Sequence, residues 1–270
     1  MTKSDEYYVG TCTHVNESDE IDRSAERRIA WLQSMYRKGL RVMIALIGNN
    51  QVGFLHLLPI EICPWGPLGR DLAVIPCLVV QERAKGQGVG RALIAAAEEE
   101  AIRQNRKGLV TIGYYHDFWF MPARFFQSCA FSPVGQVREV AQEGEKDYLG
   151  KEVTLWKVFD SSAHAPECLR RRFNVSRTPG KVTVELFWNT FCQTSNIEAE
   201  RVRQVAAEFG DSVLLHEYCA DDPAVLRRYQ IPRAIFIDGD EIGWGYEAPV
   251  EGIRCAVAQA LEPHRSKRDD

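Results

Sequence analysis

The sequence predicts an α/β protein made of two consecutive units. Strand-like and helix-like blocks alternate up to residue 160, give way to small, polar and basic residues over 161–179, and alternate again over 180–262. A charged tail, 263–270, follows. With 270 residues and 45% hydrophobic side chains, the chain is long enough for two cores of modest size. We therefore expect a first unit at 1–160, a linker at 161–179 and a second unit at 180–262.

The first unit is expected to begin with a helix and a hairpin. Residues 24–39 place apolar side chains at helical spacing and end at Gly39, a helix stop. The stretches 41–49 and 51–60 flank a turn-forming sequence and predict the hairpin. A central strand, a helix, a strand, a short helix and a final strand follow at residues 71–80, 91–103, 108–115, 122–131 and 152–159.

The second unit predicts the order strand, helix, strand, helix, strand, strand, helix. Gly210 ends the first helix, Asp222 and Pro223 open the second, and an Asp-Gly turn joins the last two strands. These elements occupy residues 181–188, 196–210, 212–218, 222–230, 232–245 and 249–262.

Charge and composition narrow the range of functions. The formal net charge is −4 and the basic residues are mostly scattered, which argues against a nucleic-acid partner. The N-terminus is polar and no apolar segment has the length of a membrane span, so we expect a cytoplasmic protein with no membrane partner. Eight dispersed cysteines without a C-x-x-C pair indicate reduced thiols rather than a disulfide framework.

A glycine-rich loop, KGQGVGR at 85–91, lies between the central strand and the next helix. A nucleotide P-loop needs Lys and then Ser or Thr after its last glycine, and neither is present. A dinucleotide loop needs G-x-G-x-x-G after the first strand of a βαβ unit, whereas this chain has G-x-G-x-G after a hairpin. A third mechanism is a cradle for the pyrophosphate of coenzyme A, formed by bare backbone N–H groups at a helix N-terminus. We favour this third mechanism.

The loop resembles the [RQ]-x-x-G-x-[GA] motif of the GNAT acetyltransferase superfamily. In the preferred register Lys85 takes the first position, Gly88 and Gly90 are the paired glycines, and the family's leucine falls on Leu93. An alternative register starts at Arg83 but places no leucine at that spacing. The preferred register departs from the motif in having lysine at its first position.

The resemblance covers roughly the first 160 residues, and segments 59–80 and 114–126 are similar to a YoaP-like subgroup. It implies a mixed, mostly antiparallel split sheet with helices on both faces. It also implies acetyl-CoA as the donor and direct attack by the primary amine of a small-molecule acceptor. The residues that it assigns to the cofactor are Leu78, Val79, Val80, Lys85, Gly86, Gln87, Gly88, Val89, Gly90, Arg91 and Phe126.

The same resemblance leaves the acid and the base open. Residues 122–131 resemble the family's A-x-x-[FY]-Y-x-x-x-G-F element, with Ala123 and Phe131 as anchors. Phe126 stands where the family often has a catalytic tyrosine, and Ala130 stands where it has a glycine. A phenyl ring cannot protonate the departing thiolate, so another residue must do so.

Candidates for acid and base come from the ends of strands. Glu61 follows the expected strand at 51–60 and is our candidate for the base, while Tyr114, Tyr115 and His116 lie at the end of the expected strand at 108–115. Each also has an ordinary structural explanation: a solvated carboxylate, core packing, or a hydrogen-bonded histidine.

The acceptor site is expected from segments that cover the open end of the split sheet. These are the stretches at 10–20, 63–69 and 116–120. Cys12 and His14 have C-x-H spacing, which is a weak metal signal, and we expect no metal. The sequence leaves a homodimer open.

The second unit resembles a thioredoxin-like domain, as YoaP-type proteins carry at the C-terminus. Cys192 lies between the first strand and first helix, and Pro232 lies where that fold keeps a cis-proline facing the active cysteine. Ser195 replaces the second cysteine of C-x-x-C, so no disulfide can form within the motif. We expect the helix N-terminus to lower the pKa of Cys192. A thiol role and a purely structural role both stay open.

The leading hypothesis is an acetyl-CoA-dependent N-acetyltransferase fused to a thioredoxin-like module. One alternative is an acyl-CoA-binding sensor or regulatory protein, because Phe126 replaces the usual acid. A second alternative is a thiol-redox protein centred on Cys192.

Overall fold

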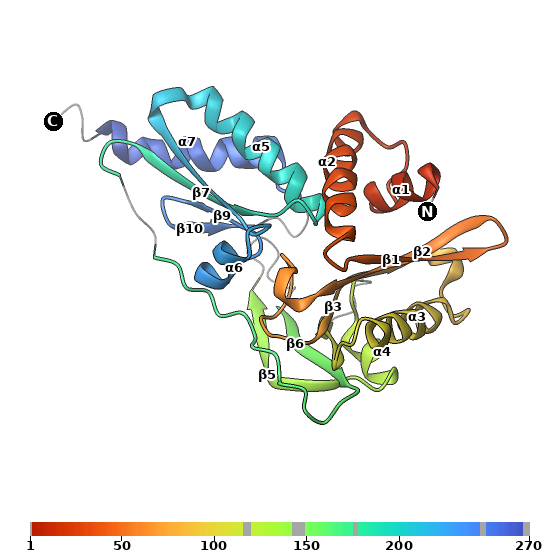
Figure 1. Cartoon of the computed structure of the whole chain (residues 1–270). Coiled ribbons are helices and arrows are strands. Elements are labelled where there is room, and N and C mark those ends of the chain that lie inside the picture. Colours follow the sequence, from red (N-terminus) through yellow and green to blue (C-terminus); the bar gives the residue numbers. More distant parts are fainter. Residues whose placement is uncertain (1, 116–119, 142–148, 175–177, 244–246, 267–270) are drawn as a thin grey trace.

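Two β-sheets, one in each half of the chain, organise the structure (Figure 1). The computed structural model describes residues 2–115, 120–141, 149–174, 178–243 and 247–266. Within these ranges the first sheet has the strand order β1-β2-β3-β4-β6-β5 and the second has the order β10-β9-β7-β8. The predicted mixed α/β class is confirmed. None of the helices in the described ranges is both long enough and apolar enough to cross a membrane.

Two helices precede the first sheet. Helix α1 (Lys3–Gly10) opens with a capping box in which Thr2 and Asp5 bond each other's backbone N–H groups. Helix α2 (Asp19–Tyr36) begins after Ser18, whose hydroxyl accepts the N–H of Ile21. The sequence predicted α2 but not α1, because α1 is mostly polar and buries only its last residues.

The first sheet is antiparallel except at one junction. Its strands are β1 (Arg41–Ile47), β2 (Asn50–Pro59), β3 (Ala73–Val80), β4 (Gly108–Tyr115), β5 (Ser132–Ala141) and β6 (Leu149–Val158). Only β3 and β4 run parallel. Strand β5 was not predicted, because Pro133 and Gly135 interrupt its pattern.

Strands β3 and β4 separate along their length. They pair only through Ala73, Val74 and Ile75, and the C-terminal parts of both strands diverge beyond that point. The β2–β3 register shifts between His56 and Leu58, which marks a bulge opposite Pro76. Because Pro76 has no N–H, it cannot donate to a neighbouring strand. The sheet is therefore split between β3 and β4, as expected.

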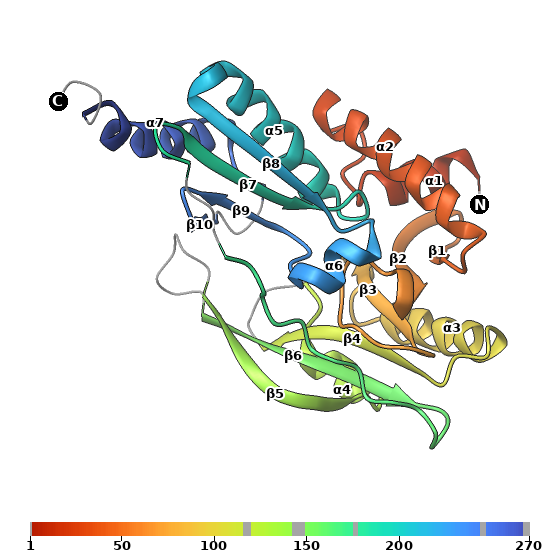
Figure 2. The same cartoon turned by 60° about the vertical axis from the view of Figure 1, so that its left-hand side comes forward.

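Helices cover both faces of this sheet (Figures 1 and 2). Helices α3 (Val89–Arg103) and α4 (Ala123–Ser128) lie on one face, which we call the helix-α3 face. Helices α1 and α2 lie on the opposite face, which we call the helix-α2 face. Neighbouring residues of β3 alternate between them: Leu78 packs with the helix-α3 face, and Cys77 packs with the helix-α2 face.

The second unit follows the predicted order of elements. Its elements are β7 (Val182–Trp188), α5 (Gln193–Phe209), β8 (Val213–Cys219), α6 (Pro223–Tyr229), β9 (Ala234–Ile237), β10 (Asp240–Ile242) and α7 (Val250–Ser266). Strand β7 runs parallel to β8 and antiparallel to β9. Asp238 and Gly239 both have positive φ at the predicted hairpin turn.

The two units share contacts at several places. Helices α2 and α5 lie side by side (Figures 1 and 2). Phe191, just before α5, is 3% exposed and packs into the core of the helix-α2 face. Glu167, in the segment that connects the two units, exchanges backbone hydrogen bonds of 2.9 and 2.8 Å with Leu68 of the first unit. The second unit therefore covers part of the first unit's sheet.

Candidate functional site

The glycine loop places two residues in the left-handed region. Gly86 has φ +74° and Gly88 has φ +82°, a conformation that side chains disfavour. A Cβ atom added at either position would meet no atom within 4 Å. The loop therefore needs these glycines for its backbone shape, and the space in front of them is open.

The backbone N–H groups of residues 86–91 have no acceptor in the described part of the chain. Lys85 donates to the carbonyl of Glu82, and the next backbone donor is Ala92, which bonds Gly88. The intervening donors lie in the loop and the first turn of α3, where the helix dipole is positive. Such a row of donors can bind an anion.

Gly90 has a different task from the other two glycines. A Cβ atom there would lie 2.9 Å from Cζ of Phe125, so glycine permits close packing between α3 and α4. Nearby side chains are also engaged within the protein. Lys85 pairs with Glu82 at 2.5 Å, and Gln87 donates to the carbonyl of Arg83 at 2.9 Å.

Arg91 does not extend toward the open loop. Its guanidinium donates to the carbonyl and the hydroxyl of Ser128, at 2.9 and 3.0 Å. Val89 is 9% exposed and belongs to the core. The anion-binding capacity of the loop thus resides in its backbone.

The divergence of β3 and β4 exposes a backbone donor of β3. The N–H of Leu78 donates to the sulfur of Met121 at 3.3 Å. A thioether is a weak acceptor, which a carbonyl oxygen can replace. Val79 lies on the helix-α2 face, whereas Leu78 and Val80 pack toward α3.

Tyr115 ends β4 on the far side of the split. Its hydroxyl oxygen accepts a hydrogen bond of 2.9 Å from Nε2 of Gln127 in α4. The hydroxyl proton is therefore directed elsewhere. Tyr114 packs against the core of the helix-α3 face, and His116 lies outside the described residues.

Phe126 is wholly buried. Its ring lies edge-on to Phe125 and Phe131, with centroids 5.3 and 5.6 Å apart. Ala130 has φ +67°, which agrees with its alignment to a family glycine and is strained for alanine. Burial gives Phe126 a packing role in this structure.

Glu61 lies at the closed end of the β3–β4 pair. Its carboxylate accepts the N–H of Asp71 at 2.8 Å and pairs with Arg106 at 2.9 and 3.1 Å. Asp71 precedes β3 and Arg106 precedes β4. These contacts anchor the starts of both strands, on the side away from Leu78.

The helix-α2 face contains a buried histidine that the sequence analysis missed. His56 is 0% exposed, and neither ring nitrogen has a hydrogen-bond partner among the described residues. Its ring lies between Phe54 and Phe191, at centroid distances of 5.2 and 5.0 Å. Burial lowers the pKa of His56 well below its usual value. The one available signal was a histidine within an otherwise apolar strand.

Cys192 also lies at this face, and two expectations about it are wrong. Burial raises the pKa of Cys192, and the positive charge of Arg233 does not reverse the effect, so the helix N-terminus does not produce the expected lowering. The described residues contain no cis peptide bond, so the bond before Pro232 is trans. Asn189 nevertheless joins the two positions. It accepts the N–H of Cys192 at 2.8 Å and donates to the carbonyl of Pro232 at 2.9 Å.

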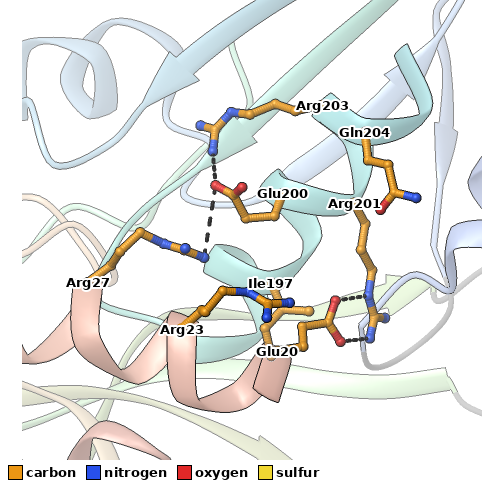
Figure 3. A pocket seen from close by; sticks show the side chains of 8 residues that line it. All are labelled: Glu20, Arg23, Arg27, Ile197, Glu200, Arg201, Arg203 and Gln204. Carbon is orange, nitrogen blue, oxygen red and sulfur yellow. Dashed lines mark hydrogen bonds and ion pairs between the residues drawn. The ribbon is translucent and has the colours of Figure 1, made fainter. Parts of the chain in front are cut away.

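A charged pocket of ≈ 370 Å³ lies between α2 and α5 (Figure 3). Glu20 of α2 pairs with Arg201 of α5 at 2.6 and 2.8 Å. Arg27 and Arg203 approach Glu200 at 3.9 and 2.6 Å. The pairs of Glu20 with Arg201 and of Arg27 with Glu200 link the two units, whereas Arg203 and Glu200 both belong to α5.

The described residues show no cluster of three or more potential metal ligands. His14 instead pairs with Glu17 at 2.9 Å on the surface. Cys12 turns toward the core of the helix-α2 face.

Comparison with known proteins identifies the first unit. Residues 38–133 match the family model described as an acetyltransferase (GNAT) domain. These residues therefore belong to a GNAT acetyltransferase domain, which forms part of the first unit. No match was found among curated proteins.

Several solved structures are similar to part of the chain. An N-acetyltransferase from Staphylococcus aureus is 16% identical and has a TM-score of 0.44, with 59% of this chain and 96% of that chain covered. A ribosomal-protein-alanine N-acetyltransferase from Brucella melitensis is 21% identical, with a TM-score of 0.41 and coverages of 58% and 96%. A Bacillus subtilis acetyltransferase in complex with CoA is 16% identical, with a TM-score of 0.36 and coverages of 46% and 80%.

Proposed function

We propose that the protein transfers an acetyl group from acetyl-CoA to the primary amine of a small-molecule acceptor by direct attack on the thioester. The observation that carries this proposal is the row of backbone N–H groups at residues 86–91, which have no acceptor among the residues that the structure describes. Their position at a helix N-terminus suits the pyrophosphate of coenzyme A. The GNAT match over residues 38–133 supports the same donor.

The split between β3 and β4 gives the rest of the cofactor a path into the sheet. The N–H of Leu78 points into the split, and because side chains and amides alternate along a strand, that of Val80 points the same way. These donors suit the amide groups and the acetyl carbonyl of acetyl-CoA. When the carbonyl oxygen displaces the sulfur of Met121, the N–H of Leu78 stabilises the charge that develops on this oxygen.

Tyr115 is the acid that the geometry supports best. Its oxygen accepts from Gln127, so its own proton is available to the departing thiolate at the open end of β4. Tyr115→Phe should lower kcat by about 100-fold while leaving the affinity for CoA unchanged. An unchanged kcat would remove Tyr115 from the mechanism.

We also propose that residues 180–262 form a thioredoxin-like domain beside an acetyltransferase domain at 1–160. The strand order β10-β9-β7-β8, with β7 parallel to β8 and antiparallel to β9, supports this proposal. The raised pKa of Cys192 favours a structural role for this domain over dithiol chemistry at the motif. Cys192→Ser should therefore leave acetyl transfer unchanged, and a large loss would restore Cys192 as a catalytic candidate.

Two measurements test the main proposal together. Calorimetric titration with acetyl-CoA measures donor binding, and release of free CoA thiol over a panel of small amines measures transfer. We expect binding and amine-dependent thiol release. Tight binding without release by any amine would favour the acyl-CoA sensor, and absence of binding would overturn both.

A further inference from the structure

The pocket between α2 and α5 has more positive than negative charge. The side chains that line it are Arg23, Arg27, Arg201, Arg203, Glu20, Glu200, Ile197 and Gln204. Its four guanidinium groups exceed its two carboxylates by two charges, although the formal net charge of the whole chain is −4. The excess of positive charge is therefore a local property of this pocket.

Both carboxylates of the pocket already have arginine partners on α5. Glu20 accepts hydrogen bonds of 2.6 and 2.8 Å from Arg201. Glu200 accepts one of 2.6 Å from Arg203, which also donates to Glu217 at 2.6 and 3.1 Å. These pairs balance the charges contributed by α5 and by Glu20. The positive charge that remains belongs to the two arginines of α2.

The two arginines of α2 keep donors that no protein group uses. The guanidinium of Arg23 is exposed and has no hydrogen bond or ion pair within the part of the chain that the structure describes. Arg27 donates through Nε to the side-chain oxygen of Asn196 at 2.8 Å. Its terminal nitrogen Nη2 stays 3.9 Å from Glu200, which is too far for a hydrogen bond.

Arg23 and Arg27 lie one helical turn apart and extend from α2 toward α5 (Figure 3). Side chains at such positions are neighbours, with Cβ atoms roughly 5–6 Å apart, and like charges there repel each other. Glu20 is a nearby negative charge, because hydrogen bonding from Arg201 and then the charges of Arg201 and Arg23 lower its pKa. Arg201 already bonds both of its oxygens, however. An anion between Arg23 and Arg27 would replace their repulsion by attraction.

A phosphate monoester suits this arrangement in charge, shape and size. Its charge is about −2 near pH 7, which matches the excess in the pocket. Its three terminal oxygens can accept from two guanidinium groups at once, and arginine binds phosphate through paired hydrogen bonds. The volume of ≈ 370 Å³ is in the range of small-molecule sites. Ile197, which is 3% exposed, provides an apolar contact for the organic part.

We propose that this pocket binds a small phosphorylated metabolite, whose phosphate group is held by Arg23 and Arg27. The ligand would contact α2 of the first unit and α5 of the second, and so stabilise the arrangement of the two units. The site goes beyond the proposed acetyl transfer. Helix α2 lies on one face of the first sheet, whereas α3 with the glycine loop lies on the other.

The test is calorimetric titration of the full chain with phenyl phosphate, near pH 8 and at low salt. We expect a Kd below about 1 mM for the wild type. Arg23→Gln and Arg27→Gln should each weaken binding by at least about tenfold, because each removes charge-assisted hydrogen bonds. Arg37→Gln is the matched control: Arg37 is an exposed arginine at the C-terminal end of α2, outside the pocket, and this variant should bind like the wild type.

The anion-binding glycine loop is a second place where phenyl phosphate could bind, and one more variant separates the two. Gly88→Glu should keep the affinity for phenyl phosphate, and Arg23→Gln should keep the affinity for acetyl-CoA. Loss of phenyl phosphate binding in Gly88→Glu together with its retention in Arg23→Gln would assign the binding to the loop and overturn the proposal. Failure of acetyl-CoA to bind would contradict the proposed function and leave this site unaffected.

Phthalate tests the choice of phosphate, since it has an aromatic ring and two negative charges but only planar carboxylates. We expect it to bind at least about tenfold more weakly than phenyl phosphate. Equal affinities would contradict a phosphate site. Absence of phenyl phosphate binding to the wild type, or an equal loss of affinity in Arg37→Gln and Arg23→Gln, would also overturn the proposal.

Discussion

Phe191 of the second unit lies edge-on to His56 of the first, with ring centroids 5.0 Å apart and planes at 84°. The ring centroid of Phe191 also lies 5.9 Å from that of Trp31. The guanidinium carbon of Arg28 lies over the Phe191 ring, 5.6 Å from the ring centroid. One side chain of the second unit thus completes the core on the helix-α2 face of the first unit's sheet.

Phe191→Ala should lower the free energy of unfolding by about 3–5 kcal/mol, because it leaves a cavity under a buried aromatic ring. Urea unfolding measures this loss. Phe131→Ala is the matched control, since Phe131 is equally buried but lies on the helix-α3 face. Only Phe191→Ala should also speed alkylation of Cys77. Equal Cys77 reactivity in the two variants would show that Phe191 does not shield this face.

Gly88→Glu should weaken binding of acetyl-CoA by at least about 100-fold, because it places a negative side chain in the anion-binding loop. Glutamate at this left-handed position strains the loop but meets no neighbouring atom, so we expect the rest of the fold to persist. Gly48→Glu is the control: Gly48 also has positive φ and open space, but lies in the β1–β2 hairpin. Calorimetric titration compares the two variants, and equal affinities would rule out the loop as the pyrophosphate site.

His56 should make the protein less stable in mild acid. Burial lowers its pKa in the folded state, and the positive charge of Arg28 adds to this effect, whereas in the unfolded chain His56 titrates near about 6.5. Below that pH the unfolded state binds a proton that the folded state does not. His56 therefore removes up to about 1.4 kcal/mol of stability per pH unit as the pH falls.

The measurement is urea unfolding at pH 7, 6 and 5. His56→Leu should flatten the decline in the free energy of unfolding as the pH falls. Identical slopes for His56→Leu and the wild type would mean that His56 takes up its proton while folded.

Ala130→Gly should raise the free energy of unfolding by about 0.5–1 kcal/mol. Alanine at φ +67° has a steric strain in the folded state that glycine avoids. We expect relief of this strain to outweigh the stabilisation of the unfolded chain by the greater backbone entropy of glycine. Thermal unfolding followed by circular dichroism tests this expectation. A lower midpoint for Ala130→Gly would show that the turn tolerates alanine without strain.

Glu61→Gln should change kcat/KM by less than about threefold and cost about 1 kcal/mol of stability. The carboxylate pairs with Arg106 and accepts the N–H of Asp71. Because the Glu61–Arg106 ion pair is partly exposed, its loss should lower the free energy of unfolding only modestly. At a rise of about 3.3 Å per residue, the seven positions from Asp71 to Leu78 place Glu61 roughly 20 Å from the split, beyond the reach of a base. A loss of activity of about 100-fold would make Glu61 the base after all.

The fold could be read from the sequence wherever apolar periodicity was strong. The hairpin, β3, α3 and the whole order of the second unit are as predicted, and so is the split sheet that the resemblance implied. Helix α1 and strand β5 were not predicted, because α1 is mostly polar and β5 contains Pro133 and Gly135. Local patterns fail where tertiary contacts rather than periodicity select the element.

Only the part of the candidate site proposed to bind acetyl-CoA could be predicted from the sequence. The glycine loop is formed by consecutive residues, so its backbone shape could be predicted from the sequence. Gly90 differs from this prediction, because it permits packing against Phe125 and does not contribute to the open anion site. The opposite face assembles Arg28, His56 and Phe191 from three distant segments. No spacing rule brings those residues together, and the raised pKa of Cys192 depends on this same burial.

The contact of Phe191 has a consequence for how such a chain can evolve. Without the second half, Trp31 and His56 would lose their aromatic neighbour, and Arg28 would lose one of its three carbonyl acceptors. The two halves therefore share part of one core and are not independent domains joined only by a linker. Separation of the gene into two would leave the core on the helix-α2 face incomplete. Packing between the halves, and not only the covalent link, therefore favours keeping them in one chain.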